Sequence, residues 1–424
     1  MTPSVPALTR RGVLAGAGAA IGAAALGEAA PANASSILPS PKASGIDHVV
    51  VVMMENRSFD HYLGWLPGAD GKQAGLSYVN RAGVRVPTHH LHDYQGCDHP
   101  DPDHSFEGGR VEYNHGRCNG WLRAGTNDRF AIGYYTDTDL SFYARAARHW
   151  TVCDRYFSAI MAETYPNRFY QHSAKTDRIH NSTDTATMPA IWDLLADAGL
   201  RGTYYYSDVP FTALWGERYA SISKPYTQFL TEAAAGTLPQ VSYVDPKFLD
   251  EGSGTSADDH PHADIRAGQY FLDQVYDAVT SSPNWERTVL VINYDEWGGF
   301  FDHVAPQVAP DAHPKWGLRG FRVPCLVISP LARRRHVAHG TFDHTSVLKM
   351  IEWRWGLPAL TPRDAAANNL AHVLDFDNPP SLAAPSYDVP AFTGAPCGAG
   401  GYADYEEWRA LKDKALTAGW VLPS

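Results

Sequence analysis

Two pairs of oxygen-bearing side chains stand directly after apolar runs of the sequence. Asp295 and Glu296 follow "VLVINY", and Glu55 and Asn56 follow "VVVVMM". Adjacent carboxylates repel one another in a cleft of low dielectric constant, and a divalent cation removes that penalty because hard cations favour oxygen ligands. A buried Glu55 would also be costly on its own. The two pairs therefore predict one divalent-metal site. The alternatives are a solvated acidic turn at 295–296 and a simple helix cap at Asn56.

A hydroxyl nucleophile is expected from the segment "MAETYPNRFYQHS", residues 161–173. Pro166, with the hydroxyl of Thr164 before it, marks the N-terminus of a helix. Such a terminus favours an anion, and a metal there would lower the pKa of the hydroxyl so that it attacks phosphorus. Asn167 is expected to donate a hydrogen bond to a phosphoryl oxygen. The alternative is that Thr164 only caps its helix.

Histidines in acidic loops complete the candidate chemistry. A phosphate ester needs donors for its oxygens and an acid for the leaving alkoxide. The segments "DPDHSFEGG", "DDHPHADI", "FFDHVAP" and "TFDHTSVLKMIEW" supply His104, His260, His262, His303 and His344. Each one taken singly is typical of a surface or capping histidine, and His344 with Asp343 would suit the start of a helix.

The elements that must position these residues alternate along the chain. Expected strands are 47–54, 287–295 and 323–330, with weaker ones at 202–209 and 240–245, and expected helices are 141–149, 189–199, 268–282 and 345–356. Near-continuous apolar runs suit parallel strands covered on both faces. The alternation predicts an α/β fold with a mostly parallel sheet between helical layers. Ligands bind past the carboxyl ends of such strands, where both oxygen-bearing pairs stand.

The chain is expected to form one catalytic domain, residues 35–424, after a targeting segment. Residues 65–130 are rich in Gly, Asp, His and Asn and predict a long loop excursion over the active face. The segment 360–424 begins rich in Pro, Ala and Gly, which indicates an extended wrap, and 405–420 should form a surface helix.

Residues 1–34 have the pattern of a signal peptide. Arg10 and Arg11 precede an Ala/Gly-rich apolar stretch that ends in the small-x-small site Ala32-Asn33-Ala34. This pattern predicts twin-arginine export and cleavage near Ala34, with an ordinary secretory signal as the alternative. The mature protein is then expected to be secreted, periplasmic or associated with the cell wall.

Cysteine usage fits an oxidising compartment. The chain has five cysteines, so at least one is unpaired. Cys97 and Cys118 lie in one loop-rich region and are candidates for a disulfide. Cys325 stands in an apolar run and is expected to be a buried thiol.

The net charge of −11 argues against a nucleic-acid binder and against a basic membrane-docking surface. It leaves room for an enzyme that contacts a membrane surface transiently through apolar loops.

Five strings in order, "DHVVVVMMENRSFDHYLG", "TYPNRFY", "DDHPHADIRAGQYFLDQVY", "NYDEWGGFFDHVAP" and "FDHTSVLKMIEW", resemble the bacterial phosphoesterase family. That family contains the non-specific phospholipases C and related acid phosphatases, and the resemblance spans about residues 46–357. It implies an alkaline-phosphatase-like three-layer α/β/α sandwich, a divalent metal and a phospholipid or small phosphoester substrate.

Residue by residue, the resemblance implies metal ligands, a nucleophile that also touches the metal, and groups that bind the phosphate. The metal ligands are Glu55, Asn56, Asp295 and Glu296, the nucleophile is Thr164, and the phosphate-binding residues are Asn167, His104 and His260. The roles of His262, His303 and His344 stay open. The metal is Ca, Mg or Mn from its oxygen ligands, or Zn if histidines take part.

Three alternatives stay open at this point. A phosphomonoesterase would use the same fold and the same residues. A sulfatase is disfavoured although "TYPNR" is similar to the sulfatase pattern, because Thr164 cannot be oxidised to formylglycine and Asn167 replaces the serine. A non-catalytic, metal-binding secreted protein is disfavoured by the presence of Thr164 beside a full ligand set.

Overall fold

The computed structural model describes residues 37–398 and 406–423, and the expected signal peptide lies outside them. Its central element is an eight-stranded sheet in the order β13-β6-β12-β11-β1-β10-β8-β9. These strands are β1 (His48–Met54), β6 (Thr151–Cys153), β8 (Gly202–Tyr206), β9 (Ser223–Pro225), β10 (Val241–Val244), β11 (Thr288–Tyr294), β12 (Cys325–Ile328) and β13 (His336–Ala338). All five expected strands are present in the sheet.

The sheet is mostly parallel, as predicted, but β12 is an exception. It pairs antiparallel with both β11 and β6, whereas the other pairings in the sheet are parallel. The expectation that 323–330 forms a parallel strand is therefore wrong. An apolar run shows that a strand is covered on both faces and does not determine its direction.

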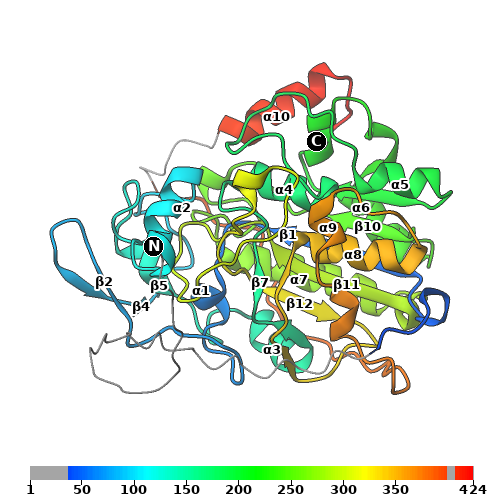
Figure 1. Cartoon of the computed structure of the whole chain (residues 1–424), viewed down its shortest axis with the longest axis horizontal. Helices are drawn as coiled ribbons and strands as arrows, with labels where there is room; N and C mark the ends of the chain where they lie inside the picture. The colour runs from blue at the N-terminus through cyan, green and yellow to red at the C-terminus, as the bar shows by residue number, and fades with distance from the viewer. Residues whose placement is uncertain (1–36, 399–405, 424) are drawn as a thin grey trace, which may run out of the picture. The chain divides into compact units, whose positions relative to one another are not determined.

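Helices cover both faces of the sheet (Figure 1). The parallel pairing of Tyr243 with Tyr204 places both rings on one face, and Tyr205 points to the other. Trp192 of α5 packs on Tyr243 and Phe229 of α6 packs on Tyr205. Because α4 contacts α5 and α8, and α6 contacts α7, the helices form two layers. The predicted three-layer α/β/α sandwich is confirmed.

The helices that flank the sheet are α3 (Tyr143–His149), α4 (Thr164–Ser173), α5 (Ile191–Asp197), α6 (Tyr226–Ala234), α7 (Ile265–Thr280) and α8 (His344–Trp355). The four expected helices are among them, and α8 starts at His344 with Asp343 as its cap, where the Asp343 side chain accepts a hydrogen bond from the Thr345 amide.

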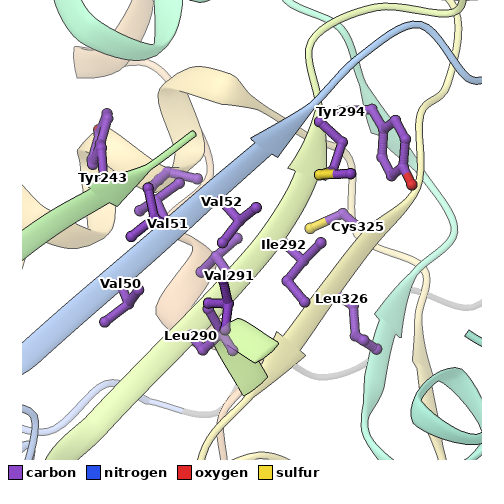
Figure 2. Packing of buried hydrophobic residues seen from close by; sticks show 14 of the residues in the cluster. Val50, Val51, Val52, Tyr243, Leu290, Val291, Ile292, Tyr294, Cys325 and Leu326 are labelled. Carbon is purple, nitrogen blue, oxygen red and sulfur yellow. The ribbon is translucent and has the colours of Figure 1, made fainter. Parts of the chain in front are cut away.

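The core is built on the central strands. Figure 2 shows Val50, Val51 and Val52 of β1 beside Val291 of β11, with Cys325 of β12 next to them. All of these side chains are at most 1% exposed. The prediction that Cys325 is a buried thiol is confirmed, since it is a free, fully buried cysteine.

Two long segments contain short elements, one between β1 and α3 and the other after α8. The first holds α1 (Phe59–Leu63), β2 (Ser77–Val79), β3 (Arg85–Pro87), β4 (His89–His90), α2 (Phe106–Tyr113) and β5 (Gly133–Tyr134), and the last holds α9 (Pro362–Ala365) and α10 (Glu406–Thr417). A further pair, β7 (Tyr156–Phe157) and β14 (Phe342–Asp343), forms a separate two-stranded sheet.

None of the helices in the described ranges is both long and apolar enough to cross a membrane.

The disulfide joins Cys97 to Cys397 and not to Cys118. Cys118 is a free, buried thiol. The expected Cys97–Cys118 pair is therefore wrong, because closeness in a loop-rich segment does not reveal that the C-terminal segment returns to that loop. Next to the bridge, the Cys397 amide donates to the Ser253 carbonyl at 2.7 Å.

Removing this bridge with Cys97→Ala and Cys397→Ala together is expected to lower the free energy of unfolding. The bridge spans 300 residues, and a loop of that length strongly restricts the unfolded chain, so a loss of about 2–4 kcal/mol is expected. Urea unfolding with and without dithiothreitol measures it. The reductant should weaken the native protein and leave the double variant unchanged, and equal sensitivity of the two would contradict the assignment.

Candidate active site

Three acidic side chains stand just past the carboxyl ends of neighbouring strands. Glu55 follows β1, Asp245 follows β10 and Asp295 follows β11. Strand β1 lies between the other two and pairs in parallel with both. Because side chains alternate along a strand, all three acids project toward the face that carries α4. Each is at least 97% buried.

Arg168 of α4 is the counter-ion of these three acids. Its guanidinium nitrogens lie 3.3 Å from Glu55 Oε1, 3.2 Å from Asp245 Oδ2 and 3.4 Å from Asp295 Oδ2. The side chain is 1% exposed, so the pairs act in a medium of low dielectric constant. The prediction that a divalent metal ion offsets the burial of Glu55 is thus incomplete, because the guanidinium of Arg168 supplies part of the compensating positive charge.

The predicted nucleophile meets the predicted ligands at the start of α4. Thr164 is the first residue of that helix and is 4% exposed. Its hydroxyl donates a hydrogen bond to the side-chain oxygen Oδ1 of Asn56 at 3.3 Å, and the backbone N–H of Asn56 donates to Asp295 Oδ1 at 3.0 Å. Asn56 has a positive φ of 61°, a backbone conformation that is enriched at functional sites. This turn directs its amide side chain toward Thr164.

Gly298 makes room for the second oxygen-bearing pair. A Cβ at this position would lie 2.1 Å from the Asn56 carbonyl oxygen, and Gly298 has a φ of +63°, so only glycine fits here. Its amide donates to Glu296 Oε2 at 2.7 Å, and the Glu296 amide donates to Asp295 Oδ1 at 2.6 Å. The backbones of Gly298 and Asn56 therefore approach one another closely.

Three candidate ligands each have a carboxylate oxygen that suits a divalent cation. Within the described residues, Glu55 Oε2, Asp295 Oδ2 and Glu296 Oε1 are buried and accept no hydrogen bond, although Asp295 Oδ2 faces Arg168. Burial raises the pKa of all three carboxyls, which means that their charges lack full compensation. Such oxygens are the ligands that hard cations prefer.

His104 and His260 lie together beside Asp101. His260 Nε2 is 3.8 Å from Asp101 Oδ2, and the two imidazole rings are 6.1 Å apart. Burial lowers the pKa of His104, but the carboxylates of Glu296 and Asp101 outweigh it and raise the pKa to about 10. Burial and the positive charge of His104 lower the pKa of His260. A protonated and a neutral imidazole thus stand side by side, an arrangement typical of an acid and a base in one site.

His344 and His262 take supporting positions. His344 Nε2 hydrogen-bonds the Asp295 carbonyl at 2.7 Å and Nδ1 lies 3.3 Å from the Tyr156 hydroxyl. The imidazole therefore holds the backbone that carries two candidate ligands. His262 Nε2 hydrogen-bonds the His99 carbonyl at 3.0 Å, and its ring is 6.3 Å from that of His260.

His303 belongs to a different cluster. Its Nδ1 pairs with Asp60 Oδ2 at 2.6 Å and its Nε2 with Asp70 Oδ1 at 3.1 Å. Arg322, which is fully buried, pairs with Asp60 and Asp302 in the same network. These contacts fit a structural ion-pair network, and they leave no imidazole nitrogen of His303 for a substrate.

Asn167 is committed to the backbone before α4. Its Nδ2 donates to the carbonyls of Ala162 and Glu163 at 2.8 and 3.1 Å, and its Oδ1 accepts from the Ile160 amide at 3.0 Å. Both protons of the side-chain amide are therefore taken. The structure gives Asn167 the role of shaping the turn that presents Thr164, and the expected hydrogen bond to a phosphoryl oxygen has no donor left.

Several acids near the site were not predicted. Glu251 and Asp258 form a group with Glu55 whose carboxylate oxygens lie within 4.8 Å of one another. Glu251 follows no apolar strand, so the sequence carries no signal for it. Asp245 ends the expected strand "QVSYVD" in the same way that Glu55 ends its own, and that pattern was sufficient to find it.

Comparisons with known proteins place the chain in a family. The model of the phosphoesterase family matches residues 46–212 and 202–358. Phospholipase C B of Mycobacterium tuberculosis is 33% identical over 437 residues, covering 83% of this chain and 82% of that protein. Non-specific phospholipase C1 of Arabidopsis thaliana is 30% identical, covering 76% of this chain and 69% of that protein.

A solved structure of a protein in the alkaline phosphatase superfamily from Vibrio parahaemolyticus is also similar, with 11% identity, 89% of each chain covered and a TM-score of 0.38. A likeness at that level adds no weight to the assignment. The family match over most of the domain, and relatives of 30% identity or more, confirm the resemblance of the five strings. The chain belongs to the phosphoesterase family and is a hydrolase of phosphoric ester bonds.

Proposed function

We propose that this enzyme is an exported, metal-dependent phospholipase C that cleaves phospholipids such as phosphatidylcholine into diacylglycerol and a phosphorylated head group. The names of its relatives support the substrate class. The observation that carries the mechanism is the hydrogen bond from the Thr164 hydroxyl to Asn56 Oδ1, because it puts a hydroxyl at a helix N-terminus in contact with a candidate metal ligand. The signal-like residues 1–34 support export by the twin-arginine route.

A divalent cation would be held by Asn56 Oδ1, the Thr164 hydroxyl and the carboxylates of Glu55, Asp295 and Glu296. When bound, it would supply Lewis-acid stabilisation and lower the pKa of the coordinated hydroxyl. The chain's own contribution is to keep these oxygens in place. Arg168 holds Glu55 and Asp295 through its ion pairs, and Gly298 fixes Glu296.

In the first chemical step Thr164 Oγ gives its proton to solvent and forms a bond to phosphorus, and the bond from phosphorus to the glycerol oxygen breaks. His104 is the acid for that oxygen, because Glu296 and Asp101 keep it protonated. Its Nδ1 hydrogen-bonds the Pro102 carbonyl at 2.8 Å, so Nε2 is the atom that gives up the proton. The positive dipole end of α4 stabilises the negative charge that develops on the phosphoryl oxygens.

The second step releases the head group from Thr164. Water attacks phosphorus and gives a proton to a base, and the bond to Thr164 Oγ breaks as this oxygen takes a proton from solvent. His260 suits this role because its lowered pKa keeps it neutral. The product is the phosphorylated head group, and Thr164 regains its hydroxyl.

The experiment that tests this function compares two substrates on one preparation of the mature protein. Phosphocholine released from phosphatidylcholine vesicles is measured beside p-nitrophenol released from p-nitrophenyl phosphate, in EDTA and after addition of Ca²⁺, Mg²⁺, Mn²⁺ or Zn²⁺. A phospholipase C releases phosphocholine faster, and only with metal. Preference for the phosphomonoester would assign a phosphatase instead, and full activity in EDTA would refute metal dependence.

A further inference from the structure

The C-terminal helix α10 lies against the residues that support the active site. Its Trp408 is 3% exposed and stacks on Phe248, with ring centroids 4.0 Å apart and an interplanar angle of 3°. The guanidinium of Arg168 lies over both rings, 4.6 Å from the Phe248 centroid and 5.7 Å from the Trp408 centroid. One side of Arg168 thus meets three carboxylates, and an aromatic pair covers the other.

A second contact joins α10 to the catalytic helix. Tyr165 follows Thr164 directly, and its hydroxyl donates to the Glu407 carbonyl at 2.9 Å. The Tyr165 ring also packs edge-on against Trp408 with centroids 5.2 Å apart. Helix α10, more than two hundred residues later in the sequence, therefore contacts the start of α4, where the nucleophile stands.

These contacts restrict the position of the guanidinium. Arg168 forms ion pairs with acids at the ends of three strands, and a planar guanidinium that lies over aromatic rings keeps a single orientation. The rings also exclude water, which strengthens the ion pairs by lowering the local dielectric constant. A looser Arg168 would let Glu55 and Asp295 shift, and a displacement of about 1 Å in a catalytic group can cost about a hundredfold in rate.

We propose that Trp408 is a positioning residue for the phosphoesterase reaction: by stacking on Phe248 and covering Arg168, it fixes the carboxylates of Glu55 and Asp295 and the start of α4. This inference rests on the proposed role of those carboxylates in the active site. It gives helix α10 a part in catalysis that acts through Arg168.

The test compares two replacements of Trp408 by apolar residues whose side chains are similar to each other in size. Trp408→Leu fills much of the space but removes the aromatic face, whereas Trp408→Phe keeps an aromatic face. Trp420→Ala is the control, because Trp420 is also a buried residue of the C-terminal segment and contacts Gly216 and Tyr206. For each variant, kcat and KM are measured with bis(p-nitrophenyl) phosphate and compared with the thermal midpoint.

Trp408→Leu is expected to lower kcat by about tenfold or more with little change in KM, because the geometry of the reacting groups is disturbed. Trp408→Phe should recover most of the kcat, and Trp420→Ala should lower the thermal midpoint but keep the kcat. The inference is overturned if folded Trp408→Leu turns over like the native enzyme, or if kcat falls with the thermal midpoint in all three variants. The substrate is a simple phosphodiester, so failure to cleave phospholipid would refute the proposed function without affecting this result.

Discussion

Thr164→Ala is expected to lower kcat by at least about 10⁴-fold, in line with the loss of a nucleophile in other hydrolases. The change removes the oxygen that would bond to phosphorus. The fold should survive, because the Thr164 hydroxyl makes one hydrogen bond, to Asn56 at 3.3 Å, and the helix continues for nine more residues. Steady-state hydrolysis of phosphatidylcholine, with thermal unfolding on the same samples, measures both effects.

Thr164→Ser is the matched control for this change. It keeps a hydroxyl at the first position of α4, so it should retain activity far above that of Thr164→Ala. A residue at the start of a helix with only a structural role would give the opposite pattern, a change in stability and none in turnover. Near-normal turnover in Thr164→Ala would remove Thr164 from the mechanism.

Glu296→Gln is expected to abolish most metal binding and to lower activity by several orders of magnitude. It replaces a carboxylate whose Oε1 is buried and accepts no hydrogen bond, and whose pKa burial raises. Without metal, the variant should be as stable as the native protein or more so, because a buried charge is gone. Metal at about 100 times its Kd should stabilise the native protein by about 2.7 kcal/mol and leave the variant unchanged.

Glu112→Gln provides the control for Glu296→Gln. Glu112 is also fully buried, and burial raises its pKa, but both of its carboxylate oxygens accept hydrogen bonds, from Trp297 and Asn127. Its replacement should lower stability and leave the stabilisation by metal intact. An equal response to metal in Glu296→Gln and the native protein, measured by calorimetric titration and thermal unfolding, would show that Glu296 is not a ligand.

The sequence was sufficient for five strands of the eight-stranded sheet and for the acids that follow β1 and β11. Apolar runs such as the one at β1 indicate burial on both faces, and parallel strands bring their carboxyl ends together, so Glu55 and Asp295 could be placed at one edge from the pattern alone. The direction of β12 could not be obtained in this way. Burial depends on side chains, whereas direction depends on how the connection returns to the sheet.

The identity of the counter-ion could not be predicted from local pattern either. Arg168 lies within the "TYPNR" string, but its contact with Glu55 and Asp245 arises only because α4 packs across the ends of β1 and β10. The same holds for Trp408, whose contact with Phe248 joins segments 160 positions apart. Both are tertiary contacts between distant segments, and a motif of consecutive residues does not record them.

The roles of the histidines could also be predicted only in part. His104 and His260 were expected near the phosphate, and the structure brings them together beside Asp101. His303 follows the acidic pair by only a few residues, yet its imidazole turns to Asp60 and Asp70. A short distance in the sequence from a motif therefore does not predict that a side chain belongs to the same site, because a turn at glycine residues changes the direction of the chain.

Mass spectrometry of acid-quenched enzyme can detect the covalent intermediate that Thr164 is proposed to form. His260→Gln, which should slow the attack of water, is mixed with metal and phosphatidylcholine, quenched during the first turnovers and digested. The account predicts a phosphocholine group on the peptide that contains Thr164, and none on that peptide when Thr164→Ala is added. A phosphocholine group on a different residue, or diacylglycerol formed in stoichiometric amount while that peptide stays unmodified, would contradict it.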